Sequence, residues 1–321
     1  MTTSNIIRPE RSMILEARER IKPYIHHTPV LSSNLINDQL GAELFFKCEN
    51  FQKVGAFKSR GAVNAVFSLS DEECKNGVCT HSSGNHAQAL ARAAMIRGIK
   101  AYIVMPETAP SVKVAAVKQY GGEITFCKPT LEARESTLAK IIEATNATEI
   151  HPYNDIRIIS GQATAAMEFF EEIEDADILM APVGGGGLLS GTAMATHYFS
   201  PDTKVIAAEP ERADDAYRSF KSKTFIPSED PHTIADGLLT SLGSITFPII
   251  CNFVDDILTV KEESIIKAMK LIWERMKIII EPSSAVPLAA LLENKIDIKG
   301  KRIGIIISGG NIDLNKLPWI K

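Results

Sequence analysis

The sequence lacks the features that would direct the protein to membranes or nucleic acids. No apolar run approaches the roughly 18 residues of a membrane-spanning helix, and the N-terminus, with Arg8, Glu10 and Arg11, has no apolar signal-peptide core. Charges of one sign form no block, and a formal net charge of -4 over 321 residues gives no electrostatic footprint for nucleic acid or an anionic membrane. We therefore expect a cytoplasmic protein that acts on small molecules.

Cysteine is scarce, and its spacing forms no motif. The five cysteines are odd in number and include no Cys-x-x-Cys, so neither a disulfide framework nor a zinc site is predicted. Internal repeats, low-complexity segments and long Pro/Ser linkers are missing as well. With 45% hydrophobic residues, the chain can form one large or two medium domains with a buried core.

Short apolar runs alternate with segments of helical periodicity. We expect strands at 44–48, 101–105, 178–183, 205–208 and 303–307, and helices at 59–68, 111–120, 132–144 and 188–198. This alternation predicts an α/β fold with mostly parallel sheets. A second domain would have to be an insertion, and we place it at 79–154, with 1–78 and 155–321 forming the larger domain.

A run of glycines follows the apolar segment that ends at Val183. Gly184, Gly185, Gly186 and Gly187 can turn successive N–H groups toward one point, and the expected helix at Leu188 adds the positive end of its dipole. The run therefore predicts a phosphate-binding turn. It is not a Walker loop, because leucines stand where that motif requires a lysine.

Two other interpretations of the glycine run stay open. Gly185-x-Gly187-x-x-Ser190 imitates a dinucleotide-binding fingerprint, and Glu209 follows near the end of the next expected strand. A tight turn that binds nothing would give the same pattern.

Lys58 is the candidate nucleophile. It follows Phe57 and stands between small residues directly before an expected helix. An apolar neighbour and the positive end of a helix disfavour the ammonium form, lower the pKa and make the amine available to a carbonyl. The alternative is an ordinary surface lysine near a helix cap.

Two polar turns could belong to the same cleft as Lys58. Ser82, Ser83, Gly84 and Asn85 precede an expected helix, whose first N–H groups could bind a substrate carboxylate. Plain capping of the helix by serine or asparagine is the alternative. The second turn begins at Ser308, directly after an expected strand.

These segments together resemble the fold-type II pyridoxal-phosphate enzymes, which have a tryptophan synthase β-like fold, and within them the serine racemase and serine/threonine dehydratase family. The resemblance covers nearly the whole chain. It rests on the motifs Phe51-Gln52-Lys53-Val54-Gly55-Ala56-Phe57-Lys58, Ser82-Ser83-Gly84-Asn85-His86, Gly184 to Leu188, Ala235-Asp236-Gly237, Ile280-Glu281-Pro282 and Ser308-Gly309-Gly310-Asn311. It implies two open, mostly parallel sheets in a large and a small domain, with the cofactor between them.

The resemblance also implies a role for each cofactor-binding residue. Lys58 would form the Schiff base with pyridoxal 5'-phosphate, and Gly184 to Leu188 would hold the phosphate. Phe57 would pack on the ring, Asn85 would pair with the ring hydroxyl, and Ser308 with the pyridine nitrogen. Because a serine hydroxyl cannot keep that nitrogen protonated, the ring is a weaker electron sink, which suits β-elimination and α-proton exchange.

By the same resemblance, the Lys58 amine takes the Cα proton of the substrate. Loss of the β-hydroxyl then leads to a 2-oxo acid and ammonia: pyruvate from L-serine, 2-oxobutanoate from L-threonine. Ser83 matches the position that faces Cα from the opposite side in the racemases, where protonation would give serine racemisation. Ser82, Gly84 and His86 are assigned to substrate binding, although His86 also suits packing.

Glu209, the carbonyl of Ala213, and Asp215 resemble the divalent-cation site of the family. All three are oxygen ligands, as Mg²⁺, Ca²⁺ or Mn²⁺ requires. A solvated acidic turn is the alternative.

Arg134 matches an arginine that can reach a dicarboxylate ligand in the racemases, which raises 3-hydroxyaspartate as an alternative substrate. The alternative for Arg134 is a surface pair with a glutamate on its own helix. Asn154 is placed on the substrate side of the cleft.

The resemblance further suggests ATP as an effector, through Ser32, Ser33, Lys53 and Asn311, and a homodimer. No isoleucine-binding regulatory domain is expected after Asn311. Three classes of function remain in competition: a pyridoxal-phosphate lyase or racemase, an NAD-dependent oxidoreductase that uses the glycine run, and a non-catalytic metabolite-binding protein.

Overall fold

The larger of two sheets has six strands. A computed structural model describes residues 6–82 and 84–320. The strands are β1 (Val30–Leu31), β2 (Glu43–Cys48), β7 (Ile178–Pro182), β8 (Lys204–Pro210), β9 (Asp256–Val260) and β10 (Arg302–Ile307). They lie in the order β1-β2-β10-β7-β8-β9, and all neighbours are parallel except β1 and β2.

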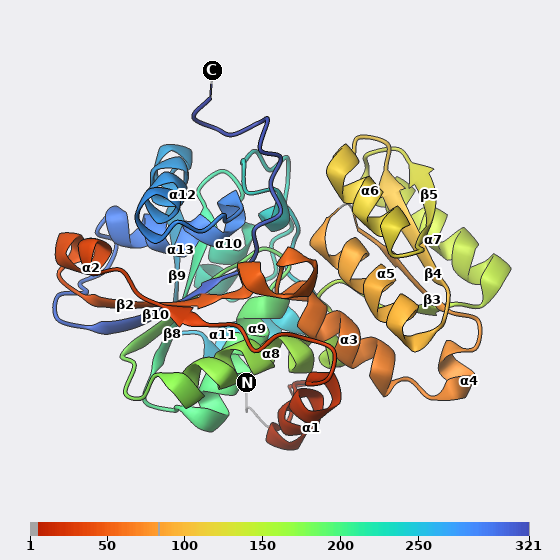
Figure 1. Cartoon of the computed structure of the whole chain (residues 1–321), viewed down its shortest axis with the longest axis horizontal. Coiled ribbons are helices and arrows are strands. Elements are labelled where there is room, and N and C mark those ends of the chain that lie inside the picture. The colour runs from red at the N-terminus through yellow and green to blue at the C-terminus, as the bar shows by residue number, and fades with distance from the viewer. Residues whose placement is uncertain (1–5, 83, 321) are drawn as a thin grey trace.

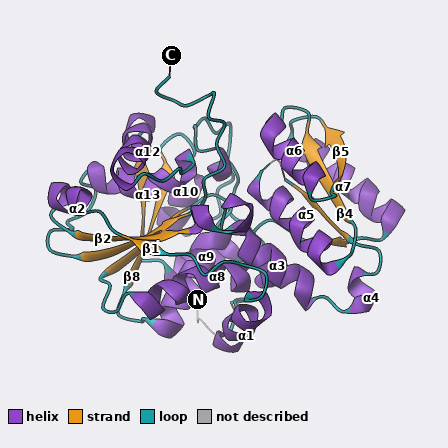
Figure 2. Cartoon of the chain, viewed as in Figure 1, coloured by secondary structure: helices purple, strands orange, loops and turns teal. Residues whose placement is uncertain are grey.

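Helices cover both faces of this sheet (Figure 2). One face packs against α2 (Asn34–Leu40), α12 (Glu262–Met276) and α13 (Pro282–Leu292). The other packs against α1 (Arg11–Ile21), α8 (Ile156–Glu172), α9 (Gly187–Phe199), α10 (Asp215–Ser222) and α11 (Thr246–Phe253). Because both faces are buried, the central strands are continuous apolar runs, as in Ile303–Ile307.

The second sheet has four parallel strands in the order β5-β4-β3-β6. They are β3 (Val78–His81), β4 (Ala101–Pro106), β5 (Glu123–Cys127) and β6 (Thr148–Glu149). Helices α5 (Asn85–Arg97) and α6 (Ser111–Gln119) cover one face, and α7 (Leu131–Thr145) covers the other. We call residues 78–149 the small lobe, and it lies beside the larger sheet in Figure 1.

The predicted α/β fold with two mostly parallel sheets is confirmed. Each expected strand and helix is present, with ends within about two residues of those predicted. The division into domains at residues 79 and 154 stays a prediction. Among the described residues, no helix is both long enough and apolar enough to cross a membrane.

Helix α3 (Lys58–Ser68) joins the two sheets, because it packs against α8 on one side and α5 on the other. The backbones of α3 and α8 touch directly at Gly61 and Gly161. A Cβ atom added to Gly161 would lie 2.6 Å from the Cα of Gly61, so neither helix can approach as closely with a larger residue there. The first residue of α3 is Lys58, and this close packing fixes where that residue lies.

A buried ionic network anchors the start of α3. The guanidinium of Arg60, which is fully buried, donates to both oxygens of Glu49 (2.7 and 2.8 Å) and to both of Glu168 (2.7 Å each). The buried Lys47 amine pairs with Glu168 at 3.0 Å. Burial alone would lower the pKa of Arg60, but the two carboxylates outweigh it and raise the pKa. The network therefore holds α3 to β2 and α8 with its charges balanced.

Removing one member should leave uncompensated charge inside the protein. We expect Arg60→Met to lower the free energy of unfolding by about 3–5 kcal/mol, because two buried carboxylates lose their partner. Urea denaturation followed by circular dichroism measures the change. Arg18→Met is the matched control, since Arg18 pairs with Glu171 at 2.9 Å on the surface and should contribute less than about 1 kcal/mol. Equal losses in the two variants would contradict the role given to the network.

Candidate active site

The glycine run forms a buried turn between β7 and α9. Gly186 has a φ of 86° and precedes the first residue of α9. In the part of the chain that the structure describes, the N–H groups of residues 184–189 donate to no protein acceptor, although all six residues are buried. Unpaired donors at the positive end of a 13-residue helix make a site for an anion such as a phosphate.

Side chains are excluded from this turn by its surroundings. A Cβ on Gly185 would lie 2.4 Å from the ring of Tyr153, and one on Gly184 would lie 2.8 Å from the Cα of Leu238. Thr246 donates a hydrogen bond to the carbonyl of Gly185 at 2.9 Å. The sequence therefore needs glycine here because neighbouring segments close over the backbone.

Lys58 lies at the start of α3 with its amine inside the protein. Nζ donates to the carbonyl oxygen of Pro152 at 2.7 Å and lies 5.2 Å from the centroid of the Phe57 ring. Burial lowers the pKa of the amine to about 8 from 10.5, while the charge of Glu281 acts in the opposite direction. The lowered pKa agrees with the sequence prediction, and its main cause is burial. About a tenth of the amine is thus uncharged at pH 7, far more than for an ordinary lysine.

Asn85, the first residue of α5, has its amide orientation fixed by two neighbours. Its Nδ2 donates to both oxygens of Glu281, at 2.9 and 3.1 Å, and its Oδ1 accepts from Nδ2 of Asn311 at 2.9 Å. Burial and the charge of Asp236 raise the pKa of the Glu281 carboxyl to about 7. Asn85 therefore belongs to a polar network that connects the small lobe to the larger sheet.

Ser308 directly follows the last residue of β10 and lies beside Phe57. Its carbonyl accepts the N–H of Phe57 at 3.0 Å, and its hydroxyl lies 3.0 Å from that of Ser284. The hydroxyl of Ser284 donates to the carbonyl of Gly309 at 2.7 Å. Ser308 accordingly presents a neutral hydroxyl whose position is fixed by β10 and α13.

The polar turn before α5 lies at the ends of β3 and β4. Ser82 accepts the N–H of Gly84 on its hydroxyl at 3.3 Å, and its own N–H donates to Val104. His86 is buried, and its Nε2 lies 3.1 Å from the carbonyl of Ile150. Burial, with a smaller effect from Lys58, holds the pKa of His86 well below its usual value, so the ring is neutral. Ser83 lies outside the described residues.

Arg134 is half-buried on α7. Its Nε donates to the carbonyl of Thr130 at 3.4 Å, and in the described part of the chain it takes part in no ion pair. The pKa of His81 is lowered first by burial and then by the charge of Arg134, which also acts on Tyr153. The surface pair that was the alternative for Arg134 is therefore not observed, and its charge acts on residues beside the candidate site.

Asn154 ties the chain that leaves the small lobe to the loop before α11. Its Nδ2 donates to the hydroxyl of Ser244 at 3.1 Å, and its Oδ1 accepts the N–H of Ile245 at 2.8 Å. These hydrogen bonds of the Asn154 amide hold the two segments together. Its part in substrate binding stays a prediction.

Two carboxylates of the predicted cation site are buried side by side. Glu209 accepts the N–H groups of Ala216 (3.1 Å) and Tyr217 (2.8 Å), whereas neither oxygen of Asp215 has a partner among the described residues. Burial raises the pKa of Asp215 to about 7, and burial together with the charge of Asp215 raises that of Glu209. No described N–H donates to the carbonyl of Ala213. Such an oxygen set fits a hard divalent cation.

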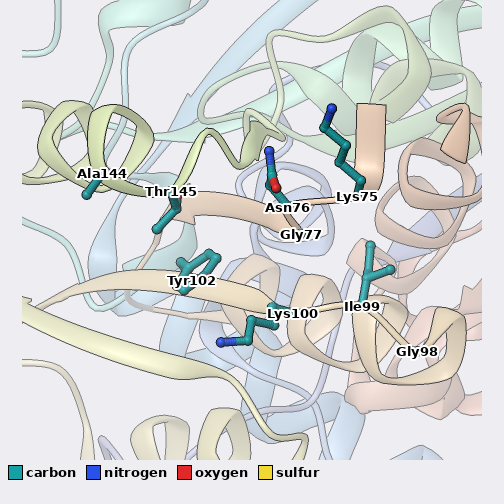
Figure 3. Close-up of a pocket in the computed structure, with 9 residues that line it drawn as sticks. All are labelled: Lys75, Asn76, Gly77, Gly98, Ile99, Lys100, Tyr102, Ala144 and Thr145. Atoms are coloured by element: carbon teal, nitrogen blue, oxygen red, sulfur yellow. The ribbon is translucent and has the colours of Figure 1, made fainter. Parts of the chain in front are cut away.

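Within the described ranges, no group of three or more His, Cys, Asp or Glu residues could hold a metal ion. The predicted cation site relies on two carboxylates and a carbonyl. A surface hollow lies elsewhere, at the amino ends of β3 and β4, and is lined by Asn76, Lys100, Tyr102 and their neighbours (Figure 3). It is at the opposite end of the small sheet from the turn before α5, so it is not the catalytic cleft.

The anion-binding turn, the half-buried amine with its lowered pKa and the neutral hydroxyl fit a pyridoxal-phosphate enzyme, and comparison with known proteins agrees. Residues 21–309 match the family model described as pyridoxal-phosphate dependent enzyme. The chain is 52% identical to β-hydroxyaspartate dehydratase of Paracoccus denitrificans, over 97% of this chain and 99% of that protein. It is 54% identical to serine racemase of Dictyostelium discoideum, with 96% of each chain covered.

A solved structure of maize serine racemase is also similar, with a TM-score of 0.94, 46% identity, and coverage of 96% of this chain and 95% of that one. The chain therefore belongs to the fold-type II pyridoxal-phosphate enzymes of the serine racemase, serine/threonine dehydratase and hydroxyaspartate dehydratase family. This finding overturns the interpretation of the glycine run as a dinucleotide-binding turn. The dinucleotide interpretation required Glu209. The carboxylate of this residue instead accepts hydrogen bonds from N–H groups at the start of α10.

The residues present fit the cofactor. The unpaired N–H groups of residues 184–189 suit its phosphate, and the uncharged fraction of Lys58 suits its aldehyde. The Nδ2 of Asn85 and the hydroxyl of Ser308 are the polar groups that the resemblance assigns to the ring. These assignments stay predictions, since they come from the motif positions.

Three contacts that support the site were not predicted from the sequence. The carbonyl of Pro152 holds the lysine amine, Tyr153 closes over the glycine turn, and Glu281 orients Asn85. Only Glu281 had a local signal, since Glu281-Pro282 opens α13 with proline at its first position. The other two act through backbone or ring contacts that no motif marks.

The lowered pKa of Lys58 can be tested on the cofactor-free protein. Only the uncharged amine attacks an aldehyde, so we expect the rate of labelling by pyridoxal phosphate to rise about tenfold per pH unit below pH 8 and to level off above it. Borohydride trapping and mass spectrometry measure the label on residue 58, with Lys58→Ala as control. A rate that keeps rising to pH 10 would indicate an ordinary lysine.

Proposed function

We propose that the protein converts β-hydroxy-α-amino acids to 2-oxo acids and ammonia, by loss of water and then hydrolysis, which takes water up again. The preferred substrate is 3-hydroxyaspartate, and L-serine and L-threonine are substrates without a second carboxylate. Arg134 carries the choice of substrate. It is a half-buried guanidinium with no carboxylate partner among the described residues, and its charge acts on His81 and Tyr153. A planar guanidinium suits a second carboxylate. The relationship to β-hydroxyaspartate dehydratase supports the same substrate.

In this proposal, Lys58 is the base that takes the Cα proton. Its amine is oriented by the Pro152 carbonyl and is partly uncharged near neutral pH. Pyridoxal phosphate, when bound, supplies the electron sink that stabilises the charge left at Cα. Ser308 favours elimination over transamination, because its neutral hydroxyl does not add a full positive charge to the ring.

The substrate's α-carboxylate is bound in this proposal at the turn before α5. Asn85 presents its N–H group at the start of a 13-residue helix, and the bond from the Gly84 N–H to the Ser82 hydroxyl supports that turn. Departure of the β-hydroxyl, followed by hydrolysis, converts 3-hydroxyaspartate to oxaloacetate and ammonia, and serine to pyruvate and ammonia. Serine racemisation is the second candidate, supported by the 54% identical serine racemase. It would use the proposed proton donor Ser83.

Arg134→Gln should separate dicarboxylate from monocarboxylate substrates. We expect KM for 3-hydroxyaspartate to rise about 10- to 100-fold, since a charge-assisted pair contributes roughly 1.5–3 kcal/mol. KM for L-serine should change less than about threefold. Oxo-acid formation from both enantiomers of serine, threonine and 3-hydroxyaspartate measures this, with Lys140→Gln on the same helix as control. An equal effect on serine would refute the substrate assignment.

The proposal includes a divalent cation, Mg²⁺ first, held by Glu209, Asp215 and the carbonyl of Ala213. It is supported by two buried carboxylates, the charge of one acting on the other, that have no cation partner among the described residues. The cation would relieve their repulsion and stabilise the start of α10. An ATP effector near Ser32, Ser33, Lys53 and Asn311, and a homodimer, rest on the family resemblance alone.

Binding of the cation should raise the Tm of the protein. We expect millimolar Mg²⁺ to raise Tm of the chelator-treated protein by several degrees, because a ligand that binds only the folded state stabilises it. Asp215→Asn should remove the increase, and Asp202→Asn, at an exposed site, should keep it. Differential scanning fluorimetry measures these shifts. A Tm of the unchanged protein that is insensitive to Mg²⁺, Ca²⁺ and Mn²⁺ would exclude the site.

A further inference from the structure

The small lobe is held to the rest of the protein by polar side chains on two sides. On one side, Arg97 donates to the carbonyls of Val66 and Leu69, and Arg92 donates to that of Tyr24 at 2.9 Å. These contacts lie where the chain enters the small lobe. On the other side, Asn85 bonds to Glu281 and Asn311, and Lys113 of α6 forms an ion pair with Asp236 of the short helix η4 (Asp236–Leu238).

Lys113 is placed where helix stability alone would not favour it. It is the third residue of α6, and a positive charge in the first turn opposes the helix dipole. It is also only 6% exposed, although burying an ammonium is costly without a partner. Most other lysine pairs of the described residues, such as Lys100–Glu123, lie at the surface. The placement of Lys113 therefore calls for an explanation outside α6 itself.

The surroundings of Lys113 supply that explanation. A Cβ atom built on Gly84 would lie 3.5 Å from its Nζ, so the ammonium lies directly beside the turn before α5. The charges of Lys113 and Asp236 also both act on the carboxyl of Glu281, which in turn holds Asn85. The ion pair thus lies beside the carboxylate-binding turn and joins it to η4.

We propose that Lys113 is a positioning residue for the substrate carboxylate. Held by Asp236 across the two lobes, its ammonium fixes the Gly84–Asn85 turn and places positive charge behind the N–H groups of that turn. This inference rests on the proposed function, which assigns the turn to the α-carboxylate. Lys113 acts through the turn, so it affects substrate binding and leaves the Lys58 amine in place.

The test compares Lys113→Gln, Asp236→Asn and the double variant with Lys113→Arg and the surface control Lys100→Gln. Each single variant should raise KM for L-serine about 10- to 50-fold and change kcat less than about threefold. The double variant should be no worse than the more affected single variant, because both remove one interaction. Lys113→Arg should recover most of the affinity. Additive losses, or a KM within threefold of the unchanged protein, would overturn the proposal.

A second measurement does not depend on turnover, so it tests the role of Lys113 even if the proposed function is wrong. Hydrogen exchange of the amides of residues 84–90, measured by mass spectrometry on the cofactor-loaded protein, should speed up at least tenfold in Lys113→Gln and stay unchanged in Lys100→Gln. Unchanged exchange would overturn the positioning role whether or not any amino acid is turned over. If Lys113→Gln does not fold, Asp236→Asn gives the same test, because the Asp236 side chain is 48% exposed.

Discussion

The buried main-chain N–H groups of residues 184–189 are the constraint on which the site depends. Each buried donor without an acceptor costs about 1–3 kcal/mol, so an anion that accepts from these groups stabilises the turn. Glycine is required there because Tyr153 and Leu238 leave no room for a side chain. In our proposal the backbone would bind the cofactor phosphate, and the side chains of the cleft would remain available for the reacting atoms.

Burial also sets the charges around the reacting atoms. It lowers the pKa of Lys58 to about 8 and raises that of Glu281 to about 7, so both groups are moved toward neutrality near physiological pH. The two remain coupled, because the charge of Glu281 supports the ammonium form of Lys58. A shared low-dielectric site thus provides an uncharged amine without a dedicated partner base. The family's range of reactions, from racemisation to elimination, is consistent with such a site.

Much of this architecture could be predicted from the sequence. Strands such as Ile303–Ile307 are continuous apolar runs because both sheet faces are covered, and the glycine run and Lys58 stand at element boundaries that periodicity locates. Strand order could not be predicted, because β10 pairs with β2 across more than half the chain.

The contacts between the lobes were equally hidden from the sequence. The Pro152 carbonyl and the Tyr153 ring act through position, and neither forms a motif. Lys113 and Asp236 are 123 residues apart in sequence, and nothing local indicates that they meet. Arg134 was placed by resemblance, and its lack of an ion-pair partner among the described residues became visible only in three dimensions.

The position of β10 has a consequence for the way the protein is made. This strand lies between β2 and β7, which share no backbone pairing without it, yet it comes from the last twenty or so residues of the chain. The larger sheet can therefore be completed only after β10, which follows β2 by more than half the chain, has been synthesised. The small lobe is contiguous in sequence and can assemble during synthesis. The turn before α5 can therefore form before the glycine turn after β7 has its neighbouring strand β10.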